Sequence, residues 1–255
     1  MKNQQTKNQL RITLLANAGI VLEYNGCTLL LDGIYQDDQH DFSNLPPHAW
    51  DCVSHYDYLL FTHAHPDHFS PELTLHFLKK YSVWGILLPD SPAFCRETLF
   101  PYLNKEQIPY LPLSGDTPHM KIQVKSDISI RILPTAHLDR HYQDVPHFCY
   151  LITCGGRSIL FTGDVDYTTE TFSLLNGQRL DAVFLNPLFF LMLDTPAYFH
   201  GVLNTGMLCV YHVPFPQDDT RQINDLLAHR LEILRDSGRT VVVLNEPLEQ
   251  IVFPQ

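Results

Sequence analysis

Apolar residues recur along the chain in short runs that have the length of β-strands. An Asn25-Gly26 pair joins the runs 18–24 and 27–32, and a Gly155-Gly156 pair joins the runs 147–154 and 157–163. Such pairs between apolar runs are strong hairpin signals. Further strands are expected at residues 11–16, 57–62, 83–89, 121–125, 128–134, 181–186, 206–211 and 240–245, the last of which is expected to be the final strand.

Helical spacing is confined to four segments. In residues 70–81, Ser70 is a candidate N-cap and Pro71 takes the first helical position. A second helix is expected to open at Ser91, and a short one near residues 169–175. Residues 218–238 form an amphipathic pattern with acids at the start and Gly238 at the end.

Strands therefore dominate, and the hairpins imply antiparallel pairs. This order fits two mixed β-sheets packed face to face with helices outside, an α+β fold, better than a strictly alternating parallel sheet. No repeat or low-complexity linker divides the chain. We expect a single domain over residues 1–255, with residues 1–9 as a flexible N-terminal segment.

Composition and charge narrow the range of possible binding partners. The formal net charge is -11, from 28 acidic and 17 basic residues, which disfavours nucleic acid and anionic membrane surfaces. The first ten residues lack the apolar core of a secretory signal, and no apolar run is long enough for a bilayer. The six cysteines are scattered without CxxC spacing, as reduced core residues would be. We expect a cytoplasmic protein without membrane or nucleic-acid partners.

Four metal-capable side chains follow the strand at residues 57–62. They are His63, His65, Asp67 and His68, within the segment Thr62-His-Ala-His-Pro-Asp-His-Phe69. Imidazole and carboxylate suit zinc and other first-row divalent ions. On an extended loop His63 and His65 project to one side, and Asp67 and His68 then turn to another direction, so one peptide can hold two ions. The alternative is a polar loop of solvated histidines.

Three distant residues repeat the pattern of a ligand directly after a buried strand. They are His137, Asp164 and His212, and His200 competes with His212 in the same stretch. Sites built on the ends of core strands are rigid and can converge from distant sequence. Each residue alone is equally well explained as a satisfied polar group at a strand end.

Together these residues resemble the metallo-β-lactamase superfamily, whose His-x-His-x-Asp-His signature matches residues 63–68. Residues 18–32 are similar to the opening strands of the branch that contains L-ascorbate-6-phosphate lactonase. The resemblance implies an αββα sandwich. It assigns one ion to His63, His65 and His137 and a second ion to Asp67, His68 and His212, with Asp164 bridging both.

The resemblance also concerns residues around the ligands. Asp32 matches a buried acid that supports the metal loop by hydrogen bonding; otherwise it is a plain turn acid. Asn17 stands where many members of that branch have a histidine, a departure that bears on a contact to the substrate. His147 and His141, near His137 in sequence, are candidates for a general acid or a substrate contact, and equally for ordinary core or surface residues.

The chemistry that this set predicts is hydrolysis by a metal-bound hydroxide at a dinuclear centre. Asp67, Asp164 and His147 are the residues expected to take part directly. The ions are two divalent cations, Zn²⁺ first and Mn²⁺ or Fe as alternatives. A small ester, lactone or phosphodiester is the expected substrate, anionic ones included. No G-x-S-x-G elbow and no Walker phosphate loop occurs.

Other functions remain open on the same fold. An RNA-processing nuclease is one, although the acidic balance disfavours it. A non-catalytic metal-binding or sensor protein is another, although all seven ligand positions are filled. Redox chemistry at a di-iron centre is a third, without a flavin-binding domain to support it. Homo-oligomerisation also stays open.

Overall fold

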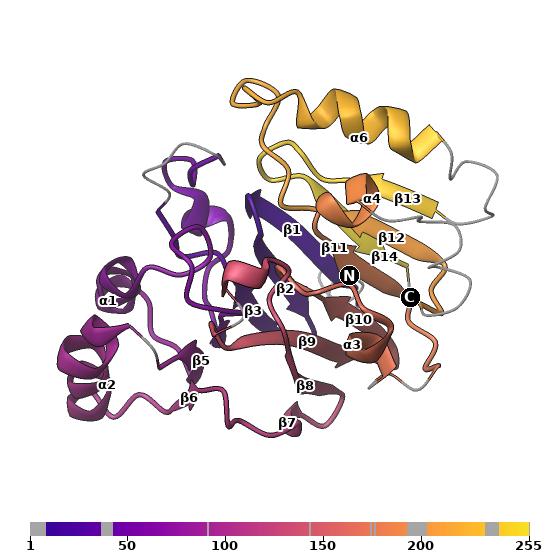
Figure 1. The fold of residues 1–255 in the computed structure, drawn as a ribbon. Coiled ribbons are helices and arrows are strands. Elements are labelled where there is room, and N and C mark those ends of the chain that lie inside the picture. Colours follow the sequence, from indigo (N-terminus) through magenta and orange to yellow (C-terminus); the bar gives the residue numbers. More distant parts are fainter. Residues whose placement is uncertain are drawn as a thin grey trace, which may run out of the picture. The chain divides into compact units, whose positions relative to one another are not determined.

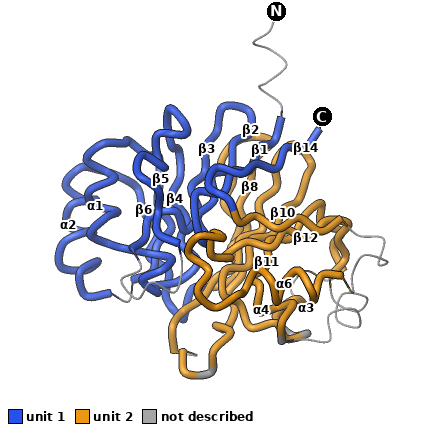
Figure 2. The backbone as a smooth tube through the Cα atoms, turned by 90° about the horizontal axis from the view of Figure 1, so that it is seen from above, with its two compact units in different colours: residues 1–117, 246–255 blue, residues 118–245 orange. Residues whose placement is uncertain are grey.

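The structure is a computed structural model that describes residues 9–36, 43–90, 92–142, 144–173, 175, 177–192, 203–232 and 240–254. The chain divides into two compact units (Figure 2). Unit 1 consists of residues 1–117 and 246–255, and unit 2 of residues 118–245. The expectation of a single domain stays a prediction, and residues 1–8 of the expected N-terminal segment lie outside the described residues.

Unit 1 contains a seven-stranded mixed sheet in the order β14-β1-β2-β3-β4-β5-β6. The strands from β14 to β3 are antiparallel neighbours, and those from β3 to β6 are parallel neighbours. Their bounds are β1 (Leu10–Ala16), β2 (Gly19–Tyr24), β3 (Cys27–Leu31), β4 (Tyr58–Leu60), β5 (Gly85–Pro89), β6 (Tyr110–Leu113) and β14 (Gln250–Phe253).

Unit 2 repeats this plan with the order β13-β12-β11-β10-β9-β8-β7. The strands from β7 to β10 are antiparallel neighbours, and those from β10 to β13 are parallel neighbours. Their bounds are β7 (Met120–Lys125), β8 (Ile128–Thr135), β9 (His147–Cys154), β10 (Arg157–Phe161), β11 (Ala182–Leu185), β12 (Met207–Val210) and β13 (Thr240–Val243). The prediction of two mixed sheets, including both hairpins, is confirmed.

The helices of unit 1 cover one face of its sheet. Helix α1 (Pro71–Lys80) begins as expected, because the Ser70 side chain accepts a hydrogen bond from Leu73 N at 3.2 Å. A 3₁₀ turn η1 (Ala49–Cys52) precedes α1, and a π-helical turn η2 (Cys95–Leu99) and α2 (Phe100–Lys105) follow it. Helices α1 and α2 lie side by side (Figure 1), and their buried residues pack with those of β4 and β5. Ser91, the expected start of a helix, lies outside the described residues.

Unit 2 has the short elements η3 (Arg140–Tyr142), α3 (Thr169–Ser173) and α4 (Leu188–Met192), and the longer helix α6 (Ile223–Glu232). The last begins later than the expected residue 218. The reason is that the Asp219 carboxylate accepts hydrogen bonds from Ile223 N at 2.9 Å and Asn224 N at 2.8 Å, which caps the helix there. Residues 233–239, its expected end, lie outside the described residues.

Two strands, β6 and β14, were not predicted from the sequence. The expectation that residues 240–245 form the final strand is wrong, because β14 follows at Gln250–Phe253 and pairs with β1. Strand β6 was missed as well. Both are four-residue strands at a sheet edge, and in β14 only Ile251 and Phe253 are buried. So few inward residues give almost no periodic signal.

Central strands are buried on both faces. All five residues of β3 and all four of β11 are buried. This explains their continuous apolar runs, since a strand with one solvated face would alternate. Within the described ranges, no helix combines the length and hydropathy that a bilayer crossing needs.

The cysteines behave as the composition suggested. All six are free thiols; Cys52 is exposed and the other five are buried. Burial raises the pKa of Cys149 to about 12 and that of Cys95 to about 12. The reactive thiolate is therefore scarce at these positions at neutral pH.

We predict that one thiol of the native protein reacts with an aromatic disulfide reagent at pH 8 at least about ten times faster than the other five. Exposed Cys52 is the group responsible, so Cys52→Ser removes the fast phase. Absorbance of the released thiolate measures both. Two or more fast thiols in the native protein would contradict this assignment of buried and exposed cysteines.

Candidate metal centre

In unit 1, the dense histidine segment leaves β4 and turns sharply. The backbone N–H of His68 donates to the carbonyl of His65 at 3.0 Å, which closes the turn. His63 and His65 point the same way, as expected for the extended part, with Nε2 of His63 3.1 Å from Nδ1 of His65. Beyond the turn, Nε2 of His68 lies 3.6 Å from a carboxylate oxygen of Asp67. Unit 1 therefore offers two separate pairs of candidate ligand atoms.

Asp32 is hydrogen-bonded to the start of this segment. It is 1% exposed, and its carboxylate accepts hydrogen bonds from Thr62 N at 2.8 Å and Thr62 Oγ1 at 2.6 Å. Its Oδ2 also lies 3.0 Å from Nδ1 of His68. Because a carboxylate only accepts, the ring proton of His68 lies on Nδ1, and Nε2 keeps its lone pair.

Thr62 fixes the ring tautomer of His63 in the same way. Its hydroxyl proton is used toward Asp32, so its oxygen accepts from Nδ1 of His63, 3.0 Å away. Nε2 of His63 is thereby left as an acceptor that faces His65. A partner that fixes one ring nitrogen and leaves the other as ligand is the usual environment of a metal-binding histidine. Thr62 was not singled out in the sequence, although it is the residue just before the signature.

Asn17 supports the same loop from the turn between β1 and β2. It is 0% exposed, and its Nδ2 donates to the carbonyl of Asp67 at 2.8 Å. The turn approaches the backbone after Asp32 so closely that a Cβ at Gly19 would lie 3.0 Å from the Cα of Gly33. The side chain that departs from the family pattern thus binds the backbone of a predicted ligand residue.

In unit 2, Asp164 lies between two histidines. One carboxylate oxygen is 3.9 Å from Nε2 of His137, and the other is 3.5 Å from Nε2 of His212. A short bridge positions the first pair, since Leu138 N donates to the Asp164 carbonyl at 2.8 Å. His212 is 1% exposed, whereas its competitor His200 lies outside the described residues.

Asn186 orients Asp164 and was missed as a site residue. Its Nδ2 donates to Oδ1 of Asp164 at 2.7 Å, and its own Oδ1 accepts from Leu188 N at 2.9 Å. The amide is therefore fixed at both ends. The signal was present in the sequence, because Asn186 directly follows the apolar run of β11, as His137, Asp164 and His212 follow theirs.

His137 carries a contact that an ion would have to change. Its Nδ1 accepts a hydrogen bond from Asp139 N at 3.1 Å, so the ring proton lies on Nε2 in this state. Holding an ion through Nε2 would require the ring proton to be on Nδ1, and the hydrogen bond from the Asp139 N–H would then be lost.

The two histidines near His137 differ sharply. His147 opens β9, is 1% exposed, and places Nδ1 2.7 Å from Thr135 Oγ1; its ring centroid is 5.9 Å from that of His137. The side chain of His141 is 90% exposed and lies beside Asp139. Of the two, only His147 is built into the same buried region as a candidate ligand.

Three of these residues have a left-handed backbone. They are Asn17 (φ 50°), Asp32 (φ 44°) and His212 (φ 60°). This conformation costs about 1–2 kcal/mol for a residue with a Cβ and is found most often for Asn, Asp and His. It turns the side chain abruptly at the end of a strand. Such strained positions cluster at functional sites.

The separations within each unit suit a divalent ion. Zinc–nitrogen bonds of about 2.0–2.1 Å in a tetrahedral site place two ligand atoms about 3.3 Å apart. The four pairs have separations of 3.1, 3.6, 3.9 and 3.5 Å. Imidazole nitrogens and carboxylate oxygens form the donor set, which fits zinc, manganese or iron.

The fold and these strand-end residues define a metallo-β-lactamase-like protein with candidate metal ligands. Residues 29–191 match the family model of the beta-lactamase superfamily domain, and the chain belongs to that superfamily. The predicted superfamily is thus confirmed, while the lactonase branch stays a prediction.

One relative in Mycolicibacterium smegmatis, whose name describes a Rieske 2Fe-2S iron-sulfur protein, is 31% identical over 88 residues. The match covers 33% of this chain, and the chain spans 17% of the length of that relative.

Solved structures share the fold over nearly the whole chain. The metallo-beta-lactamase fold protein YhfI from Bacillus subtilis has a TM-score of 0.63 and 16% identity, covering 97% of this chain and 100% of its own. An isothiocyanate hydrolase from Delia radicum gut bacteria has a TM-score of 0.64 and 15% sequence identity, and the match covers 95% of this chain and 99% of the hydrolase. The diiron β-hydroxylase CmlA from Streptomyces venezuelae has a TM-score of 0.62 and 16% sequence identity, and the match covers 98% of this chain and 55% of CmlA. At these identities the likeness concerns the fold alone.

We predict that Asp32→Asn lowers the free energy of unfolding by about 2–4 kcal/mol, because a buried network loses its charged acceptor. The same change should weaken zinc binding about 10–100-fold through His68. Urea unfolding and competition with a chelating dye measure the two effects.

Asp57→Asn is the matched control. Asp57 is a buried acid of the same unit that accepts from Thr28 N at 2.7 Å, and no contact described for it involves the histidine segment. It should lose stability and keep its zinc affinity. Equal zinc affinities in the two variants would show that Asp32 is only a structural acid.

We also predict that Asn17→Ala weakens zinc binding about ten-fold, because the Asp67 carbonyl loses its donor. Asn25→Ala is the control: Asn25 is another left-handed residue (φ 48°) in a hairpin turn of the same sheet, and it is exposed. Both variants should lose about 1 kcal/mol of stability from backbone strain. A similar zinc affinity for both would refute the role of Asn17 in the loop.

Proposed function

We propose that this chain is a metal-dependent hydrolase with two divalent ions, Zn²⁺ by preference, bound by His63, His65, Asp67, His68, His137, Asp164 and His212. The observation that carries the proposal is Asp164: its two oxygens face different histidines, at 3.9 Å and 3.5 Å. A carboxylate placed in this way serves two ions better than one.

The proposed ligand sets are those that the family resemblance implies. We assign His63, His65 and His137 to one ion, and Asp67, His68 and His212 to the other, with Asp164 shared because its two oxygens face different histidines. Each ion then has four protein ligands at most, and the shared carboxylate lowers the repulsion between the two positive charges.

Two divalent ions held in this way supply a hydroxide nucleophile near neutral pH and stabilise negative charge on the attacked group. The chain's own residues prepare the site. Asp32 and Thr62 fix the ring tautomers, Asn17 holds the backbone at Asp67, and Asn186 fixes Asp164. Ligands that are already oriented need no rearrangement during the reaction.

Asp67 and His147 are proposed to handle protons and substrate. The Asp67 carboxylate is partly exposed, with 16% of its side chain accessible, whereas His63 and His68 are buried, so it can steer an attacking water. His147 is buried and held at Nδ1 by Thr135, which leaves it oriented for proton transfer to a leaving group.

A small ester, lactone or phosphodiester is the proposed substrate class. The net charge of -11 disfavours the long-range attraction of a nucleic-acid chain, so the nuclease alternative is the weaker one. A small-molecule substrate and a cytoplasmic location are part of the same proposal. Tight binding to structured RNA at physiological salt would favour the nuclease.

We predict about two metal ions per chain after gentle purification, by elemental analysis. Asp164→Asn should reduce this number to about one or less, because the shared ligand loses a charge and one coordinating oxygen. Asp181→Asn is the control, since Asp181 is a half-buried acid of unit 2 that accepts from Ser158 N at 2.8 Å. Less than one ion per chain in the parent protein would contradict the dinuclear centre.

Hydrolysis itself is tested with bis(p-nitrophenyl) phosphate and a γ-lactone. We predict that Asp164→Asn lowers kcat/KM at least about 100-fold, the loss expected when charge stabilisation in the transition state is removed. Asp181→Asn should stay within about two-fold of the parent. Two bound ions without turnover of either substrate would favour the sensor alternative.

A further inference from the structure

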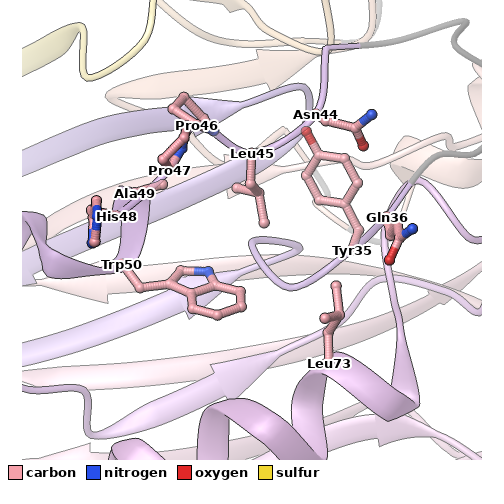
Figure 3. Close-up of a pocket in the computed structure, with 10 residues that line it drawn as sticks. All are labelled: Tyr35, Gln36, Asn44, Leu45, Pro46, Pro47, His48, Ala49, Trp50 and Leu73. Atoms are coloured by element: carbon pink, nitrogen blue, oxygen red, sulfur yellow. The ribbon is translucent and has the colours of Figure 1, made fainter.

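Unit 1 contains a cavity of about 420 Å³ between the segment after β3 and helix α1 (Figure 3). Its size is within the range of small-molecule sites. The walls are largely carbon, from Tyr35, Leu45, Pro46, Ala49, Trp50 and Leu73. Among the described residues that line it, none is Asp, Glu, Lys or Arg.

The polar ends of the two aromatic side chains are hydrogen-bonded to backbone carbonyls of the chain. The Trp50 indole N–H donates to the carbonyl of Gly33 at 2.7 Å, and the Tyr35 hydroxyl donates to the carbonyl of Ser43. Each polar end is thus occupied within the chain and the ring is fixed. The side-chain amides of Gln36 and Asn44 add polarity at one side of the cavity (Figure 3).

The cavity wall is bonded to the backbone next to Asp32 and to the histidine segment itself. Trp50 binds Gly33, which directly follows Asp32. The Gln36 N–H donates to the carbonyl of Pro66 at 3.3 Å, next to Asp67, and the Ser70 N–H donates to the carbonyl of Ile34 at 2.9 Å. A group bound in the cavity therefore rests on the same backbone that carries the candidate ligands.

We propose that this cavity binds a neutral, mostly apolar group, such as an alkyl chain or an aromatic ring, and that this group is the remote end of the substrate. The second part rests on the proposed hydrolase function. The described lining has no Asp, Glu, Lys or Arg, and its histidine, His48, is 84% exposed at the side chain and lies 3.1 Å from the Asp51 carboxylate, so an ion would find no buried partner of opposite charge. Apolar walls with a few polar groups are the usual composition of small-molecule sites.

Binding can be measured without any turnover. Trp50 and Trp84 are the two tryptophans of the chain, and Trp84, with 55% of its surface exposed, does not line the cavity. In Trp84→Phe, Trp50 emission reports on the cavity alone. We expect a saturable emission change with 1-octanol, and at least about ten-fold weaker binding of octanoate, which has the same chain length and a charge.

Two substitutions on α1 separate the cavity from general damage. Leu73→Gln should weaken 1-octanol binding at least about ten-fold, and Leu73→Met should preserve it. Leu75→Gln is the control: Leu75 is also half-buried on α1 and packs on the same core, but it does not line the cavity. No emission change with 1-octanol, or equal effects of Leu73→Gln and Leu75→Gln on its binding, would overturn the site.

The substrate assignment has its own readout. With metal-loaded protein, kcat/KM should rise at least about ten-fold from γ-butyrolactone to γ-decalactone, and Leu73→Gln should remove this gain while Leu75→Gln keeps it. Octanol binding with no effect of chain length would mean that a separate neutral molecule occupies the cavity, against the substrate assignment. Absence of all lactone turnover would instead count against the hydrolase function, and the octanol result would still decide the cavity.

Discussion

A single buried carboxylate orders the histidine segment. Asp32 is nearly inaccessible to water, and burying a carboxylate without donors costs several kcal/mol. All the partners described for it come from the segment it supports: the amide and hydroxyl of Thr62 and the ring of His68. The charge is therefore compensated only when the segment has this one conformation. Geometry that serves metal binding is thereby coupled to the stability of unit 1.

Both sheets place polar residues directly after the carboxyl ends of their parallel strands. In each, three antiparallel pairs are followed by three parallel pairs. Parallel strands bring their carboxyl ends to one edge, and polar residues follow those ends directly. In unit 1 they are Asp32 and the segment from Thr62, and in unit 2 they are Asp164, Asn186 and His212. Rigid core strands thus set the positions of side chains that are far apart in sequence.

Much of this could be predicted from the sequence. Long apolar runs and the Asn25-Gly26 and Gly155-Gly156 turns gave the central strands, and the placement of Asp32 beneath the loop followed from the family resemblance. The edge strands β6 and β14 could not be found, because a strand with one or two inward residues has no measurable period. The onset of α6 was placed too early, since acids before a helix can cap it as Asp219 does.

The supporting hydrogen bonds were the least predictable part. Thr62, Thr135 and Asn186 are ordinary polar residues in the sequence, and only the structure pairs them with His63, His147 and Asp164. Asn17 was noticed as a departure from the family, yet its bond to the Asp67 carbonyl depends on a left-handed turn that no local pattern specifies.

The proposed dinuclear centre requires that Asp164 be shared by two ions. Electron paramagnetic resonance of the protein loaded with Mn²⁺ tests it directly, because two ions joined through one carboxylate interact magnetically. If Asp164 is shared, the parent protein gives the spectrum of a coupled manganese pair, and Asp164→Asn gives the six-line signal of an isolated ion. An isolated-ion spectrum from the parent protein at two Mn²⁺ per chain would contradict it.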